Sequence, residues 1–269
     1  MGFQLKKVSD HGTSNPIVAR LVLQSDDLLG FSNLSKEQKE EVLVLYHEQV
    51  MPRLLTCDTI SKRVVERTET IVASIKARGL VTQAQGRVVE VPQVQDLDQD
   101  VEQYLYNAKS VLRDAAKILK IFFNEDFQDA RYDKVIPWGE TKFGPDSEFV
   151  RVLREDQDLW MRRLIRMRNA VEHPGGHSGH LHVHNFEATG NTVSTPSWHL
   201  NGDPRSGIAH DMPVFVHNML TFCEELLVFG IRTTGMFPGV AVVEVPETDR
   251  VPDCPKRLKV ALLNPLPPR

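Results

Sequence analysis

Cysteine is scarce in this chain, with only three in 269 residues. Cys57, Cys223 and Cys254 are widely spaced, and no Cys-x-x-Cys pair occurs. An odd number of distant cysteines excludes a closed disulfide framework. Cys223 lies in an apolar helical run, so we expect it to be a buried free thiol. Together these features favour a reducing, cytoplasmic environment.

We also expect no signal sequence, and the chain has no long apolar run and no large excess of one charge. A secretory signal requires an apolar segment after its basic residues, and none follows Lys6 and Lys7. No apolar run approaches the length that spans a bilayer. We therefore expect no membrane association. The 32 basic and 36 acidic residues give a net charge of −4, so any nucleic-acid contact must come from a local basic patch.

Helical periodicity dominates what is present. Apolar residues recur at spacings of three and four, which indicates helices that each bury one face. The predicted helices cover residues 35–50, 54–78, 98–124, 146–173 and 212–232. The residues expected at helix ends are Ser35 with Gln38 as a capping box, Gly79 as a C-cap, Asp146 or Ser147 as an opening residue and Asp211 as a cap.

Shorter segments alternate in the manner of β-strands. Residues 181–186 and 192–200 flank the turn signal Gly190-Asn191 and predict a hairpin. Two tail segments, 240–245 and 257–263, read as strands that could join this hairpin, and the Pro-rich end 265–269 follows them. Residues 17–23 fit either a short strand or an extended arm, and 80–97 a loop with at most one short strand.

These patterns predict a mainly α protein, a helical bundle with a small appended antiparallel β-sheet or hairpin. We divide it into an N-terminal arm (1–34), a helical domain with a hairpin insertion at about 180–200 (35–235), and C-terminal strands with a Pro-rich tail (236–269).

The end of the helix predicted over 146–173 carries an unusual set of polar residues. Arg162, Arg166, Asn169 and His173 fall at i, i+4, i+7 and i+11, so they share one helix face. Pro174 then stops the helix. Arg168 lies about 140° around the helix from His173. The two can meet on one ligand only if the last turn unwinds or a second copy of the helix contributes its own pair.

A purely structural interpretation is also available for these residues. Arg168 and Glu172 are spaced i,i+4 and could form a surface salt bridge, while His173 could cap the helix C-terminus, where the dipole favours a cation.

The segment Arg168-Asn169-Ala170-Val171-Glu172-His173 resembles the signature of HEPN (higher eukaryotes and prokaryotes nucleotide-binding) domains. It has an arginine, a polar residue, three further residues and a histidine, at the end of a long amphipathic helix. The resemblance covers about 35–235 and implies a HEPN-type bundle that dimerises so that two motifs face each other. It points to Arg168, Asn169 and His173 as catalytic residues.

The activity that this resemblance implies is metal-independent cleavage of RNA without a cofactor. Histidine suits proton transfer near neutral pH, and arginine suits the charge of a phosphorane. Arg162, Arg163 and Arg166 are then candidates for binding the RNA backbone. The expected partners are RNA, a second copy of the chain and a cognate inhibitor protein, and a toxin or defence component is the role we expect.

Two other functions stay open. A non-catalytic HEPN-like module would bind a nucleotide or a protein partner without turnover. A metalloenzyme would use His180, His182 and His184, which alternate and would point to one face of a strand. His199, His210 or Asp211 could supply a further ligand. A polar outer face of a hairpin explains the same histidines without any metal.

Overall fold

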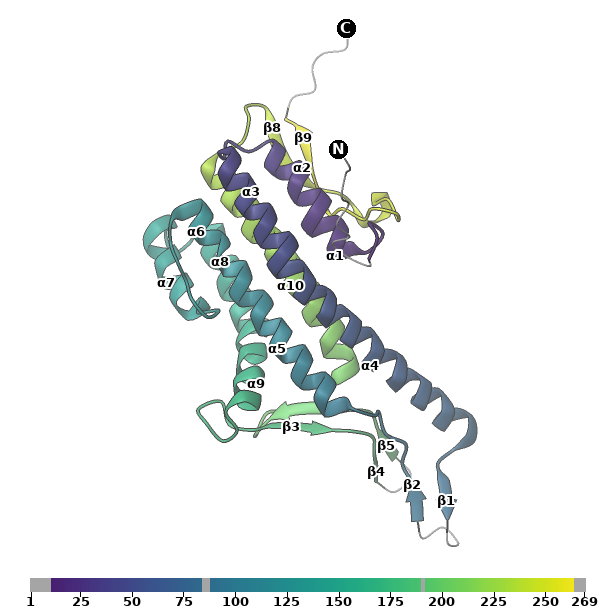
Figure 1. Ribbon diagram of the computed structural model, residues 1–269. Helices are drawn as coiled ribbons and strands as arrows, with labels where there is room; N and C mark the ends of the chain where they lie inside the picture. The colour runs from purple at the N-terminus through teal and green to yellow at the C-terminus, as the bar shows by residue number, and fades with distance from the viewer. Residues whose placement is uncertain (1–10, 84–87, 190–191, 264–269) are drawn as a thin grey trace, which may run out of the picture. The chain divides into compact units, whose positions relative to one another are not determined.

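A computed structural model describes residues 11–83, 88–189 and 192–263. The predicted turn at Gly190-Asn191, the Pro-rich end 265–269 and the N-terminal residues Lys6 and Lys7 lie outside them. The described chain is mainly α-helical with small antiparallel sheets, as predicted (Figure 1). The α-helices are α1 (Pro16–Val18), α2 (Ser25–Gly30), α3 (Lys36–Val44), α4 (Met51–Arg78), α5 (Leu97–Ala116), α6 (Ile118–Phe123), α7 (Tyr132–Phe143), α8 (Glu148–Asp156), α9 (Arg162–Glu172) and α10 (Ile208–Thr234).

Other helical segments and short strands complete the secondary structure. Three π-helical segments are η1 (Ala19–Gln24), η2 (Leu45–Val50) and η3 (Gln157–Met161), and a 3₁₀ turn is η4 (Glu247–Asp249). The strands are β1 (Val81–Gln83), β2 (Val88–Glu90), β3 (Leu181–His184), β4 (Glu187–Thr189), β5 (Thr192–Ser194), β6 (Ser197–Leu200), β7 (Ser206–Gly207), β8 (Val240–Glu244) and β9 (Leu258–Leu262).

The chain separates into two compact units, each assembled from distant parts of the sequence. The first comprises Met1–Leu55, Ser110–Gly144 and Met219–Arg269, and the second comprises Thr56–Lys109 and Pro145–Asn218. The division into an arm, a helical domain and a C-terminal segment stays a prediction.

Several helix ends have the chemistry that the sequence predicts. Ser35 and Gln38 form a reciprocal capping box, in which the Ser35 hydroxyl accepts from the Gln38 backbone N–H at 3.2 Å. The Ser147 hydroxyl accepts from the Val150 N–H at 3.4 Å, so Ser147 opens α8. Gly79 follows α4 with a φ of +71°, which only glycine adopts without strain.

The prediction of a strand or extended arm at residues 17–23 is wrong. The Asn15 side chain accepts from the Ile17 N–H at 2.9 Å, and Pro16 occupies the first turn, so a helix begins here. Leu21 and Leu28 are fully buried, and the helical spacing accounts for their burial. The run of apolar residues in this segment has no clear period, which is why sequence alone left it ambiguous.

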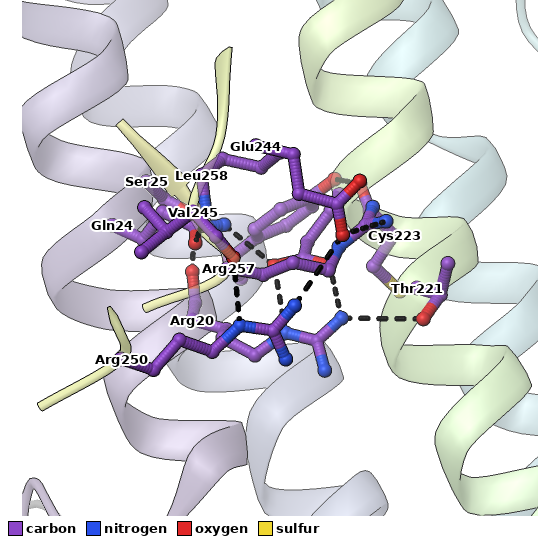
Figure 2. Close-up of polar contacts among 12 residues, drawn as sticks. Arg20, Gln24, Ser25, Thr221, Cys223, Glu244, Val245, Arg250, Arg257 and Leu258 are labelled. Carbon is purple, nitrogen blue, oxygen red and sulfur yellow. Dashed lines mark hydrogen bonds and ion pairs between the residues drawn. The ribbon is translucent and has the colours of Figure 1, made fainter. Parts of the chain in front are cut away.

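A buried cluster of charges joins three parts of the first unit (Figure 2). The Glu224 carboxylate on α10 accepts from Arg20 Nε at 2.7 Å, from Arg257 Nε at 2.7 Å and from Gln24 Nε2 at 2.6 Å. Gln24 Oε1 in turn accepts from the Leu258 backbone N–H at 2.6 Å. Glu224 and Arg20 are 1% and 5% exposed. The N-terminal helices and β9 are therefore fixed to α10 by paired buried charges.

Two further predictions for the first unit are corrected. The region between the helices predicted over 98–124 and 146–173, which Pro137-Trp138-Gly139 and Gly144-Pro145 predict to be a loop, contains α7. Tyr132 on α7 packs edge-on against Phe222 and donates to the Leu112 carbonyl at 2.7 Å, which accounts for the helix. In the described part of the chain, β8 pairs with β9 in a sheet of their own rather than with the 181–200 hairpin.

In the second unit, the helix predicted over 146–173 is divided by a π-helical segment. The wider turn of η3 shifts the buried face between α8 and α9. Trp160, Leu164 and Leu159 all belong to the apolar residues that recur at helical spacing in this segment, which predicts that they are buried. Trp160 and Leu164 are buried, but Leu159 is 72% exposed, so its predicted burial is wrong. A constant period of 3.6 residues cannot anticipate this shift.

The predicted hairpin forms in the second unit. β3 pairs antiparallel with β6 in the register Leu181↔Leu200, and β4 pairs with β5. Asp211, predicted as a cap, instead lies within α10 and accepts from Trp198 Nε1 at 2.6 Å, from Ser206 Oγ at 2.6 Å and from Arg163 Nη2 at 2.9 Å. Burial acts to raise the pKa of Asp211, but the hydrogen bonds and the Arg163 charge outweigh it and lower the pKa.

The helix α10 is the exception to the expected absence of a long apolar run. Its most apolar window has a mean hydropathy of 1.5, so length and composition would allow α10 to cross a membrane. That window is 67% buried inside the protein, which is also typical of a helix in a protein core.

Candidate functional site

The motif helix α9 ends one residue before the predicted end at His173. Glu172 is its last helical residue, and His173 follows with φ −132° and ψ 72°, outside the helical region. The His173 backbone N–H still donates to the Asn169 carbonyl at 2.9 Å. His173 is exposed, and the chain turns away at Pro174. The last turn is therefore intact through Glu172, and only His173 itself departs from helical geometry. Arg168 and His173 can then act on one ligand only through the second condition, a second copy of the helix that contributes its own pair.

Arg168 is held on both sides. Its Nη1 donates to Glu172 Oε2 at 2.9 Å, so the i,i+4 pair suggested by the sequence forms. The guanidinium carbon lies 5.5 Å from the centre of the Tyr106 ring on α5, a cation–π distance. The Arg168 side chain is 13% exposed. Its orientation is therefore fixed, and a phosphate must compete with Glu172 for it.

Asn169 is also oriented by α5. Its Oδ1 accepts from Lys109 Nζ at 3.1 Å, which leaves the Asn169 amide N–H groups facing elsewhere. Tyr106 and Lys109 were not identified from the sequence as site residues. Their spacing of three places both on one face of α5, but only the packing of α5 shows that this face meets α9.

A tight loop connects the motif to β3, which lies beside α9 (Figure 1). Gly175 and Gly179 have φ values of +75° and +77°. Asn201 Oδ1 accepts from the His180 backbone N–H at 3.0 Å, and a Cβ on Gly179 would stand 2.0 Å from Asn201 Nδ2. These two glycines and Asn201 therefore set the path of the chain after His173.

The histidines after the motif form a row across two strands, which differs from the prediction. His182 and His184 lie on β3, but His180 precedes the strand. His199 on β6 stacks with His182, with ring centres 4.9 Å apart, and its Nε2 lies 3.1 Å from His184 Nε2. In residues 11–83, 88–189 and 192–263, no group of three His, Cys, Asp or Glu side chains is placed to hold a metal.

Hydrogen bonding explains the contact between His184 and His199. His184 Nδ1 lies 3.1 Å from Glu187 Oε1, and a carboxylate can only accept, so Nδ1 carries the proton. In the neutral imidazole with the proton on Nδ1, His184 Nε2 is the acceptor and His199 Nε2–H the donor. His199 Nδ1 is left buried without a hydrogen-bond partner in the described residues. The pair thus has the arrangement of an N–H···N hydrogen bond.

The arginines predicted to bind RNA are each engaged by a carboxylate. Arg163 belongs to the Asp211 cluster and therefore supports the fold. The other two pairs are Arg162 with Asp158 at 2.9 Å and Arg166 with Asp203 at 4.0 Å, and all four side chains are about half exposed or more. Exposed pairs of this kind are weak and can exchange for a phosphate.

Comparison of the chain with family profiles, with curated proteins and with solved structures finds no match. Function must therefore be argued from the chemistry of the residues around α9.

Proposed function

We propose that this chain is a HEPN-like, metal-independent endoribonuclease that acts as a homodimer through Arg168, Asn169 and His173. The observation that carries the proposal is the exposed His173 directly after the last helical residue of α9. It follows, within one and a half turns, an arginine and an asparagine that α5 holds in place. A surface salt bridge between Arg168 and Glu172 does not by itself explain an exposed histidine in this position or the contacts from α5 to Arg168 and Asn169.

In the proposed reaction, the 2′-oxygen of the RNA forms a bond to phosphorus while the bond from phosphorus to the 5′-oxygen breaks. A neutral imidazole takes the 2′-OH proton, and an imidazolium gives a proton to the leaving 5′-oxygen. One His173 cannot fill both roles at the same moment, so two copies supply the base and the acid. Arg168 stabilises the charge on the phosphorane, and Asn169 orients the phosphate.

The charges near the motif favour RNA binding through a few local contacts rather than through the net charge of the chain. Lys109 adds a positive charge beside Asn169, although the net charge of the chain is −4. Binding should therefore depend on a few contacts and weaken moderately with salt.

A non-catalytic binding module is the second candidate, and one observation favours it. Arg168 is already paired with Glu172 and covered by Tyr106, so RNA must break an existing contact to reach it. Such a module would keep the dimer and bind a nucleotide or a partner without turnover.

The test is cleavage of a mixed RNA pool by the full chain in EDTA, beside H173A and H177A. His177 is a matched control, because it is also exposed and lies four residues beyond the motif. We expect H173A to lose at least about a hundredfold in rate and H177A to stay near wild type. The products should carry 2′,3′-cyclic phosphate and 5′-OH ends.

Two outcomes would contradict the nuclease. A folded dimer that cleaves nothing, in H173A and wild type alike, would favour the binding module. Activity that appears only when zinc or manganese is restored would redirect attention to His184 and His199.

A further inference from the structure

A cavity of about 180 Å³ lies beside the end of the motif helix, within the second unit. Three elements line it: the first turns of α5, the end of α9 with the following loop, and β3. Its walls include Val171, Pro174, His180 and Leu181, and its acidic side carries Asp98 and Glu102. Pro174 directly follows His173, so the cavity adjoins the proposed site of cleavage.

The volume limits what the cavity can hold. Pockets that enclose a drug-sized ligand measure roughly 300–1,000 Å³, so this one suits a single ring system rather than a whole nucleotide. Aliphatic side chains line part of it, and the rings of Pro174 and His180 form part of its wall, against which a base can pack. The phosphate of a bound nucleotide would then stay outside the cavity, near His173, which directly precedes the lining residue Pro174.

The two carboxylates of the cavity lack partners. Asp98 and Glu102 are one turn apart on α5 and exposed, and neither side chain has an ion pair or hydrogen bond within the described ranges. By contrast, the acidic residues next to them in the fold are paired: Asp100 with Arg63, and Glu172 with Arg168. Free carboxylates repel phosphate but accept N–H donors.

We propose that this cavity binds guanine, as the base adjacent to the phosphate that the enzyme cleaves. This inference rests on the proposed nuclease function and specifies its substrate. The guanine edge presents N1–H and N2–H₂ side by side, and one carboxylate accepts both in parallel. Glu102 or Asp98 would take this role, and the other would accept the remaining N2 hydrogen.

The other bases fit an acidic acceptor less well. Adenine and cytosine each place a ring-nitrogen acceptor beside their single amino donor, and that lone pair would face a carboxylate. Uracil has one N–H between two carbonyl oxygens. A carboxylate pair therefore favours guanine over the other bases for two reasons. The other bases form fewer hydrogen bonds to it, and they place unpaired acceptor atoms against it.

The test is the affinity of the full chain for the four nucleoside 3′-monophosphates, measured by calorimetry. The readout is the ratio of the dissociation constants, because removal of two negative charges strengthens the binding of every anion. D98N/E102Q is compared with E66Q/E69Q, which removes two exposed carboxylates of the same unit that do not line the cavity. We expect guanosine 3′-monophosphate to bind wild type and E66Q/E69Q about tenfold more tightly than the other three.

D98N/E102Q should lose that preference and bind all four nucleotides alike. Equal binding of the four by wild type, or a preference that survives D98N/E102Q, would overturn the guanine site. Because nucleotide binding needs no turnover, the two proposals fail separately. Cleavage that depends on His173 but shows no base preference refutes only the cavity, whereas a guanine preference without cleavage refutes only the nuclease.

Discussion

The cluster around Glu224 and the end of α9 both contain arginine and carboxylate side chains, but the carboxylate is buried and paired in the first region, whereas those in the second are exposed. Glu224 is 1% exposed and accepts from Arg20, Arg257 and Gln24, so its oxygens are occupied within the protein. At the end of α9, His173 is exposed and the carboxylates nearby include unpaired ones. A buried charge requires partners to offset its desolvation, whereas an exposed one stays available to a ligand. Pairing and burial, more than residue type, therefore distinguish a charge that stabilises the fold from one that is available to a ligand.

The largest effect should follow from breaking the buried cluster. E224Q removes the buried counter-charge of Arg20 and Arg257, and of the two only Arg257 keeps a second carboxylate, Glu244 at 4.0 Å. We expect a loss of about 3–5 kcal/mol in the free energy of unfolding, measured with urea. E69Q, an exposed carboxylate on α4, should change stability by less than about 0.5 kcal/mol. If the two variants were equally stable, the cluster would not hold the first unit together.

A smaller effect should follow from a change at Asp211. Its ion-pair partner Arg163 is 37% exposed, so this pair is less buried than the cluster around Glu224. D211N keeps one acceptor for Trp198 but removes the charge, and we expect a loss of about 2 kcal/mol near neutral pH. Urea unfolding of D211N and of wild type measures it.

The pH dependence of that difference follows from the lowered pKa of Asp211. A carboxyl with a lowered folded-state pKa stabilises the fold fully above its unfolded pKa, about 3.9, and the contribution disappears as the pH falls through the folded pKa. The difference between wild type and D211N should therefore be constant from pH 8 to 5 and shrink below about pH 4. A difference that shrinks above pH 5 would contradict this account.

Features with a local cause could be predicted from the sequence. The capping box at Ser35, the opening of α8 at Ser147 and the end of α9 at Glu172 each depend on residues within one turn. The pairing of β3 with β6 likewise follows from alternation on both sides of a turn signal. The position of His173 at the end of its helix belongs to this group.

The features that could not be predicted from the sequence depend mostly on contacts between residues that are far apart in the chain. Tyr106 and Lys109 contact the motif only because α5 packs against α9, and the Glu224 cluster joins residues more than 200 positions apart. The exposure of Leu159 could not be predicted, because the π-helical segment η3 shifts the helical period by part of a turn. A pattern with one fixed period contains none of this information.

The loop that follows His173 offers a test of moderate size. Gly179 has a φ of +77°, and a Cβ there would displace Asn201 and its bond to His180, so G179A should cost about 1–2 kcal/mol in unfolding free energy. G202A is the control, because no atom lies within 4 Å of a Cβ at that position. RNA cleavage should fall in G179A and not in G202A, since only the former moves the chain after His173.

The smallest stability effect, and a gain in binding, is expected from E172Q. The pair of Glu172 with Arg168 is spaced i,i+4 and Glu172 is 42% exposed, so its loss should cost a few tenths of a kcal/mol. RNA would then no longer compete with a carboxylate for Arg168. We expect E172Q/H173A to bind RNA about twofold to fivefold more tightly than H173A, in which cleavage does not interfere.

E155Q/H173A is the matched control for that gain, because Glu155 pairs with Arg151 at the same spacing on α8. An equal gain in both variants would show only the effect of net charge. A gain confined to E172Q/H173A, which shrinks as salt rises, would show that Arg168 contacts the RNA phosphate. The salt bridge would then act as a weak internal competitor, so that the same arginine serves the fold when RNA is absent and the substrate when it is bound.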